Sequence, residues 1–358
     1  MTVYAHINTV PNGSTGSIMM KEHRKLLTAG NDSFVFWGRG RTAEGEHECR
    51  FSTDIDSRLD ALQTRIDGKA GFHSKAATRR LLARLDEINP DVVHLHNIHG
   101  YYVNVEMLFE WLAAHECKVE WTLHDCWAFT GHCAYGEPCS QLHAYPKTFS
   151  KASCTWNFDA KKHFFNLVPA ERMKLIAPSQ WLADLVGESF LKDYPIEVRH
   201  NTIDTSVFKP TPSDFRDRYG IGNRFMILGV ASPWTERKGL GDFIRLAGEI
   251  DNEKYAIVLV GLSGKQIRRL PAGVIGIRRT DSREQLATIY TAADVFFNPT
   301  TEDNYPTVNL EAEACGTPVV TYDTGGCRET IRKKESIVIE ANQSVEFNLS
   351  IINHIRLT

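Results

Sequence analysis

Short apolar runs alternate along this chain with longer segments in which apolar residues recur every three or four positions. Runs of the first kind predict buried strands, and the three-to-four spacing predicts amphipathic helices. The predicted strands are 2–8, 33–37, 91–97, 118–125 and 173–179, followed by 225–232, 255–261, 273–277, 294–298, 317–322 and 336–341. Because the two kinds of segment alternate, we expect an α/β protein with parallel sheets and helices on both faces.

The predicted helices fill the intervals between these strands. They are 18–28, most of 53–90, 105–115, a segment that begins at Asp159, 180–190, 239–250, 282–293, 308–315 and 343–358. Pro90 ends the helix of residues 75–90. In the second half of the chain, Asp281 or Ser282 caps the helix 282–293. Residues 126–160 are rich in Cys, Gly, Pro and aromatic residues, so we expect them to be irregular.

The strand–helix rhythm stops in the polar, proline-containing segment 196–222 and then restarts. A chain of 358 residues is also long for one hydrophobic core. We therefore predict two doubly wound, Rossmann-like domains, the first at 1–196 and the second at 197–342, with a terminal helix at 343–358. The first domain carries a Cys-rich insert at 126–154.

Composition excludes some classes of function but does not indicate a particular one. The chain is 42% hydrophobic and 24% charged, with a net charge of −3, which is ordinary for a globular protein and gives no bulk attraction for nucleic acid. No apolar run approaches the roughly 18 residues that a membrane span needs. The N-terminus enters a strand without a signal-peptide pattern, so we expect a cytoplasmic location.

The clearest candidate site lies between the predicted strands 294–298 and 317–322. Asp303 stands in the loop after the first of these strands, and Glu311 follows in the helix that comes next. In open parallel sheets, ligands bind at the carboxyl ends of the strands. Backbone amides at a helix N-terminus favour phosphate, and carboxylates suit sugar hydroxyls. The stretch therefore predicts a nucleotide-sugar site.

Three further segments follow strands in the same way. Gly13 and Gly16 form a glycine-rich turn after the first strand, which either lets the backbone approach an anion or only turns the chain. His124 follows the strand 118–125 on the expected ligand edge. Arg237 and Lys238 precede a helix in the second domain, where they could neutralise a diphosphate as it leaves, or could be a solvated charge pair.

The segment His94-Leu95-His96 has the spacing of metal ligands, and it ends another strand. No third ligand stands nearby in the sequence, so we do not expect a metal there. Instead, these histidines and Asn97 are expected to line the same ligand edge as His124.

Taken in order, the segments IAPSQWLADLV, RHNTIDTSVFKP, ERKG, VLVG and DNYPTVNLEAEACGTPVV resemble retaining glycosyltransferases of family 4, the glycosyl transferases group 1. The resemblance covers essentially the whole chain and is strongest at 175–329. It implies the GT-B fold, in which two Rossmann-like domains face a cleft and the C-terminal helix, here 343–358, crosses back to the first domain.

The resemblance also implies roles for single residues. Asp303 would contact the hydroxyls of the donor sugar and Glu311 the ribose. Lys238 would grip the diphosphate, His124 would contact the donor sugar, and Gly16 would lie near the phosphates and the acceptor.

The loop before the helix would bind the distal phosphate through backbone amides, which implies donor contacts for Asn304, Tyr305, Thr307 and Val308. Two departures from the family pattern bear on these contacts. Asp303 is one methylene shorter than the usual Glu. The family's arginine after the first strand of the second domain is replaced by Ala231-Ser232-Pro233-Trp234, so either Arg237 substitutes for it or the role is missing.

The implied activity is transfer of a sugar, with retention of configuration, from a UDP- or GDP-sugar to a glycan or polyprenyl-linked acceptor in surface polysaccharide biosynthesis. No cofactor is required for such catalysis. The alternatives are a nucleotide-sugar epimerase of GT-B fold and a non-catalytic protein that binds a nucleotide sugar. A phosphorylase would need a pyridoxal-binding lysine setting, which we do not find.

Two features lie outside this scheme. Cys126, Cys133, Cys139 and Cys154 cluster in the irregular insert, where they either ligate a structural zinc ion or remain plain thiols. Basic residues recur at Lys75, Arg79, Arg80 and Arg84, and the segment 161–165 mixes cations with aromatics. Such surfaces could hold the protein peripherally at the inner face of a membrane, although a charge run is more often only a solvated face.

Overall fold

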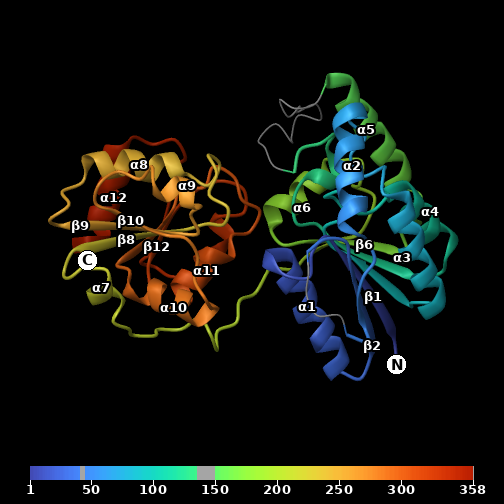
Figure 1. The fold of residues 1–358 in the computed structure, drawn as a ribbon, viewed down its shortest axis with the longest axis horizontal. Helices are drawn as coiled ribbons and strands as arrows, with labels where there is room; N and C mark the ends of the chain where they lie inside the picture. Colours follow the sequence, from blue (N-terminus) through green and yellow to red (C-terminus); the bar gives the residue numbers. More distant parts are fainter. Residues whose placement is uncertain (41–44, 135–149, 358) are drawn as a thin grey trace. The chain divides into compact units, whose positions relative to one another are not determined.

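The computed structural model describes residues 1–40, 45–134 and 150–357, which divide into two compact units, Met1–His200 and Asn201–Thr358 (Figure 1). Each unit contains one parallel sheet covered by helices, which confirms the predicted α/β class and the two Rossmann-like domains. The division falls four residues after the predicted boundary at 196/197. The difference arises because Ile196–Val198 pairs with the strand Met173–Ala177 and so completes the first sheet.

The first unit has a seven-stranded sheet in the order β3-β2-β1-β4-β5-β6-β7 among its described residues. The strands are β1 Val3–Asn8, β2 Asp32–Trp37, β3 Glu48–Arg50, β4 Val92–Leu95, β5 Lys118–Thr122, β6 Met173–Ala177 and β7 Ile196–Val198. The helices are α1 Gly13–Thr28, α2 Asp54–Asp67, α3 Lys75–Ile88, α4 Val105–Ala114, α5 Lys151–Phe165 and α6 Gln180–Gly187. A 3-10 turn, η1, spans Trp127–Phe129.

Two helices of the first unit begin earlier than the apolar pattern predicts. The helix α1 starts at Gly13 rather than at residue 18, so the glycine-rich segment is its first turn. The helix α5 starts at Lys151 rather than near Asp159, because Ser150 caps it by accepting a hydrogen bond from the Ser153 amide. The missed turn of α1 carries only small and polar residues, and the missed start of α5 has too few apolar residues to show a helical period.

The second unit has a six-stranded sheet in the order β10-β9-β8-β11-β12-β13 among its described residues. The strands are β8 Phe225–Val230, β9 Tyr255–Val260, β10 Val274–Ile277, β11 Val295–Asn298, β12 Val319–Tyr322 and β13 Ile337–Ile339. The helices are α7 Phe215–Arg218, α8 Leu240–Glu249, α9 Gly264–Ile267, α10 Arg283–Ala292, α11 Thr307–Ala314 and α12 Val345–Leu357, with a 3-10 turn, η3, at Arg328–Thr330.

The terminal helix α12 belongs to the second unit, whereas the sequence predicted that it crosses back to the first. Ile352 of α12 is fully buried in the core that α8 and β13 share. The Asn348 side chain donates to the Tyr322 hydroxyl at 3.1 Å. These contacts fix α12 beside α8 on one face of the second sheet.

Each sheet reverses its strand order beside its first strand. In the first unit this point lies between β1 and β4, and in the second between β8 and β11. Loops diverge there at the carboxyl ends of the strands and leave a crevice that suits a ligand. The predicted site residues Asp303 and Lys238 follow β11 and β8, and Gly16 and His124 follow β1 and β5.

Candidate functional site

In the second unit, two loops meet at the point where the strand order reverses. One loop follows β8 and ends at Gly239, and the other follows β11 and contains Asp303. The Thr301 amide donates to the Arg237 carbonyl at 2.9 Å and ties the loops together. Gly239 has φ +73°, and a Cβ there would lie 2.4 Å from the Pro299 carbonyl oxygen. Glycine is therefore needed for this close approach.

The close approach brings Lys238 and Asp303 into contact. The Lys238 ammonium donates to Oδ2 of Asp303, and the two side chains remain 21% and 18% exposed. The pair is therefore accessible to a ligand, and a single site offers both a cation and a carboxylate. Sequence reasoning named both residues, and the structure brings them together.

Arg237 lies in the same loop but its guanidinium points to the backbone. Its Nη1 donates to the Glu302 carbonyl next to Asp303. This contact braces the loop that carries the carboxylate. A diphosphate role for Arg237 therefore stays a prediction, and loop bracing is the role that its contact supports.

A glycine pair holds the Asp303 backbone from the other side. The Gly326 amide donates to the Asp303 carbonyl at 3.0 Å. Gly325 has φ +56°, and a Cβ at this position would lie 2.0 Å from the same carbonyl oxygen. The turn after β12 therefore fixes the carboxylate loop, and only glycine allows it to lie so close.

Glu311 lies in α11, and the hydroxyl of Tyr290 donates to its Oε2 at 3.2 Å. Burial raises the pKa of Glu311 from 4.5 to about 7, although the hydrogen bond from Tyr290 works in the opposite direction. The carboxyl group therefore changes charge near neutral pH. Tyr290 was not singled out in the sequence, because it lies in α10 and resembles any core aromatic residue there.

The predicted amide donors surround the start of α11. Asn304 and Tyr305 are buried, and the Tyr305 hydroxyl accepts from Nη2 of Arg332 at 3.1 Å. Thr307 and Val308 form the first turn of α11, where backbone N–H groups have no partner earlier in the helix. Such amides, with the positive end of the helix dipole, favour an anion.

In the first unit, Gly16 is buried in the first turn of α1. A Cβ at Gly16 would lie 2.5 Å from the Pro11 carbonyl carbon and 2.7 Å from the Val10 carbonyl oxygen. The glycine therefore allows α1 to pack closely on the loop after β1. Asn8 supports that loop by donating to the Val10 carbonyl and to the Thr15 hydroxyl.

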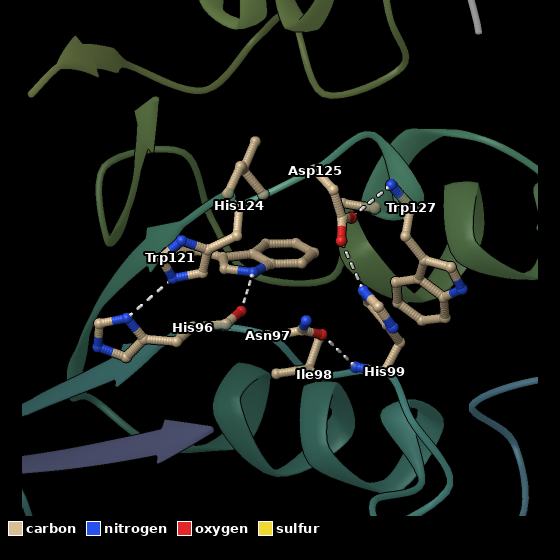
Figure 2. Close-up of a pocket in the computed structure, with 10 residues that line it drawn as sticks. His96, Asn97, Ile98, His99, Trp121, His124, Asp125 and Trp127 are labelled. Carbon is tan, nitrogen blue, oxygen red and sulfur yellow. Dashed lines mark hydrogen bonds and ion pairs between the residues drawn. The ribbon is translucent and has the colours of Figure 1, made fainter. Parts of the chain in front are cut away.

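His124 lies in a small pocket at the carboxyl ends of β4 and β5 (Figure 2). Its Nε2 lies 3.3 Å from Nδ1 of His96, and the two rings stack with their centroids 5.5 Å apart. Burial lowers the pKa of His124 to about 4, so the ring is neutral at physiological pH. A neutral imidazole can donate one hydrogen bond and accept another. The predicted position of His96 and Asn97 beside His124 is confirmed.

Asp125 next to His124 has a different environment. Its Oδ2 lies 2.8 Å from Nε2 of His99, and its Oδ1 accepts from the Trp127 amide at 2.9 Å (Figure 2). Burial tends to raise the pKa of Asp125, but His99 and the Trp127 amide hold it below its usual value. Asp125 therefore stays ionised and orders the loop that follows β5.

The predicted zinc cysteines lie only partly in the described residues. Cys126 and Cys154 are buried, Cys133 is half-buried, and Cys139 lies outside the described residues. A structural zinc at this set stays a prediction. Within the described ranges, the group of side chains close enough to hold a metal ion is instead His6, Glu22, His94 and His96.

The predicted basic surfaces are only partly exposed. Lys161 is fully buried, with its ammonium donating to the Trp127 carbonyl at 2.6 Å and lying 4.0 Å from the centre of that ring. Lys161 therefore does not contribute to a basic surface, and the interpretation of 161–165 is wrong at that position. On α3, Arg80 pairs with Asp56 and Arg84 with Glu87, which neutralises part of the cationic stripe.

The apolar surface of the first unit lies instead on α2. Ile55, Leu59, Leu62 and Ile66 are between 54% and 78% exposed. Their spacing of four, three and four residues places them on one face of the helix. None of the helices among the described residues is long and apolar enough to cross a membrane.

Comparison with known proteins covers both units. The family model described as Glycosyltransferase Family 4 matches residues 21–207, and the model described as Glycosyl transferases group 1 matches residues 223–356. A curated relative is the glycosyl transferase WcaC of Escherichia coli K12, named for colanic acid biosynthesis. It is 24% identical over 90% of this chain and 83% of its own length.

Two solved structures resemble the chain over its full length. Sucrose-phosphate synthase from Thermosynechococcus elongatus has a TM-score of 0.74 at 15% identity, covering 100% of this chain and 90% of that one. HepE of Anabaena, solved in complex with UDP-glucose, has a TM-score of 0.65 at 17% identity, covering 99% of this chain and 89% of that one. At these identities the likeness concerns the fold.

Proposed function

The chain belongs to Glycosyltransferase Family 4, and from this premise we propose that it transfers a sugar from a nucleoside-diphosphate sugar to a glycan or lipid-linked acceptor. Its fold is of the GT-B glycosyltransferase type. The observation that carries the proposal is the half-buried, solvent-accessible Lys238–Asp303 pair beside the start of α11. That place unites a cation, a carboxylate and helix amides, which are the groups that a diphosphate and a sugar need.

In this proposal the second unit binds the donor. The Lys238 ammonium turns from Asp303 to the diphosphate, and the amides of α11 bind the distal phosphate. Asp303, released from the ion pair, accepts hydrogen bonds from sugar hydroxyls. Glu311 lies in the second turn of the same helix and accepts hydrogen bonds from the ribose. Each group thereby exchanges one polar partner for another, which keeps the cost of desolvation low.

Transfer with retention then requires no protein nucleophile. The bond between the anomeric carbon and the phosphate oxygen breaks, and the acceptor hydroxyl forms its bond on the same face. The acceptor proton passes to the departing phosphate oxygen. Lys238 and the helix amides stabilise the charge that develops on the diphosphate. His124, which is neutral at physiological pH, contacts the donor sugar through hydrogen bonds.

The relatives suggest the class of donor and acceptor. WcaC is named for the biosynthesis of a polysaccharide, and HepE binds UDP-glucose. A further relative, of Mycolicibacterium smegmatis, is named a GDP-mannose-dependent mannosyltransferase. The proposed donor is therefore a UDP- or GDP-sugar, used in a step of surface polysaccharide assembly. In this proposal the acceptor is a glycan or a polyprenyl-linked sugar at the inner face of a membrane.

The exposed stripe on α2 supports peripheral contact with that membrane. Its four apolar side chains would enter the boundary between headgroups and acyl chains, and the exposed Arg58 and Arg65 would face anionic headgroups. In this proposal the membrane contact lies on α2 rather than on α3. The acceptor lipid would then reach the enzyme without leaving the bilayer.

A thermal-shift screen of the purified chain against UDP-, GDP- and ADP-sugars tests donor binding. A ligand at 100 times its dissociation constant contributes about 2.7 kcal/mol, so the matching donor should raise the melting temperature by several degrees. Products from the donor that binds separate the alternatives, because an epimerase yields an isomeric nucleotide sugar and a transferase yields the nucleoside diphosphate. Failure of every donor to shift the melting temperature would contradict the proposal.

A further inference from the structure

Three buried histidines meet on one face of the first sheet. His6 in β1 and His94 in β4 are register partners. Because side chains alternate along a strand, they point away from the core that Ala5, Ile7 and Leu95 enter. His96 follows on the same side, and its ring stacks on that of His94 with the centroids 4.2 Å apart. The exposed fraction of each histidine is 3% or less.

The helix α1 covers this face and adds a carboxylate. Oε2 of Glu22 lies 3.3 Å from Nδ1 of His94. One donor atom from each of His6, Glu22, His94 and His96 lies within 4.8 Å of the other three. The four residues, which we call the α1-face cluster, come from β1, α1 and the end of β4, and β4 is far along the chain from the other two.

Two of these rings carry buried nitrogen atoms without a hydrogen-bond partner. They are Nδ1 and Nε2 of His6 and Nε2 of His96. Burial of an unpaired polar atom costs stability, and native structures rarely tolerate it without a role for the atom. A neutral imidazole has one nitrogen with a lone pair, so one nitrogen of His6 and Nε2 of His96 are free to bind an acceptor of lone pairs, such as a metal ion.

Three of the four residues have an outer partner that leaves one donor atom facing the cluster. Nε2 of His94 lies 2.8 Å from the Thr122 hydroxyl, so its Nδ1 remains to bind. Nδ1 of His96 lies 3.3 Å from His124, which leaves Nε2. Oε1 of Glu22 accepts from Arg199 at 3.2 Å, which leaves Oε2. Metal ligands usually have such second partners, which fix their tautomer and orientation.

We propose that His6, Glu22, His94 and His96 bind one divalent transition-metal ion, with zinc as the expected occupant. Three imidazole nitrogens and one carboxylate oxygen form a tetrahedral set that suits zinc. In a tetrahedral site with zinc bonds of about 2.1 Å, two ligand atoms lie about 3.4 Å apart, and the four atoms here lie within 4.8 Å of one another. The cluster therefore closes on the ion through small side-chain rotations, for which the half-buried Glu22 has room.

The ion would also fix the state of His124, a consequence that rests on the proposed function. With the metal on Nε2 of His96, the Nδ1–H of that ring donates to Nε2 of His124. A neutral His124 then carries its proton on Nδ1 and presents a single tautomer. The metal is thus a positioning element for the site and takes no part in the transfer step itself.

Cobalt binding tests the site without an activity assay. The full chain is treated with a chelator, dialysed and titrated with Co²⁺, and the visible absorption of tetrahedral cobalt is followed. We expect one equivalent to bind, zinc to displace it, and no near-ultraviolet band from cobalt–thiolate bonds. That band would reveal binding at the cysteines instead. Its presence, or the lack of visible absorption, would overturn the proposal.

Two carboxylate variants provide the matched comparison. Glu22→Gln removes one ligand and preserves side-chain size, so cobalt affinity should fall at least tenfold. Glu120→Gln changes another carboxylate that faces Arg199, at 4.0 Å, but lies outside the cluster, and should bind as the native chain does. Equal affinity in the two variants would contradict the assignment. Donor binding plays no part in this measurement, so its outcome is independent of the proposed function.

Discussion

In the second unit, side chains of the candidate site contact each other in pairs. A bound ligand could take the place of one partner in such a pair. Asp303 is one methylene shorter than the Glu that the family resemblance implies at this position, and it contacts Lys238 directly. Glu311 is held by Tyr290 and has a pKa of about 7, so its charge depends on small changes in its surroundings. We infer that Asp303 sets which sugar fits and that Glu311 makes donor binding sensitive to pH.

Glu311→Gln tests that sensitivity. The native carboxyl group is protonated below pH 7, so donor affinity should fall as the pH drops from 8 to 6, by up to about tenfold per unit. The variant should show weaker binding at pH 8 and little change with pH. Calorimetric titration of the donor from pH 6 to pH 8 provides the measurement.

The same variant makes a prediction for stability. A folded-state pKa above the usual value stabilises the fold below pH 4.5, and this contribution is lost as the pH rises through 7. Glu311→Gln should therefore unfold at a higher temperature than the native chain at pH 8. Glu253→Gln, at an exposed position, serves as the control. For donor binding, an affinity of the native chain for the donor that stays constant from pH 6 to pH 8 would refute the role of Glu311.

The sequence predicts helices and strands correctly wherever the periodic pattern of apolar residues extends over enough positions. The buried strands β1, β4, β8 and β11 and the helices α4 and α10 lie within a few residues of their predicted bounds. The short strand β3 was missed, and so was the break between α2 and α3 at residues 68–74. These depend on pairing and turn contacts rather than on periodicity. The exposed stripe of α2 was missed because an apolar helical face normally predicts burial.

A double substitution tests the role of α2. Leu59→Gln with Leu62→Gln removes the centre of the stripe and keeps good helix formers, so the fold should persist. Binding to vesicles that contain anionic lipid should fall several-fold in a co-sedimentation assay. Arg79→Ala with Arg84→Ala on α3 should have a smaller effect. The opposite ranking of the two variants would place the membrane contact on α3.

The whole molecule combines two parallel sheets, each of which reverses its strand order beside its first strand, and the proposed donor residues Lys238 and Asp303 follow the two strands at that point of the second sheet. Sequence motifs identified Asp303, Glu311, Lys238 and His124, since each follows a strand at a recognisable place. They could not identify the α1-face cluster. His6 lies 88 residues before His94, and only the register of β1 with β4 brings the two together. The sequence shows no third ligand near His94 and His96, whereas the structure brings His6 and Glu22 beside them from distant parts of the chain.

The most direct measurement is the release of nucleoside diphosphate from the donor identified by thermal shift, compared between native chain and Lys238→Ala. The account predicts a loss of about 10²–10³ in turnover, because no other cation contacts Asp303 among the described residues and the departing diphosphate loses its charge partner. Lys265→Ala, at an exposed position in α9, should stay within twofold of the native rate. Native turnover by Lys238→Ala with the same donor would contradict the account.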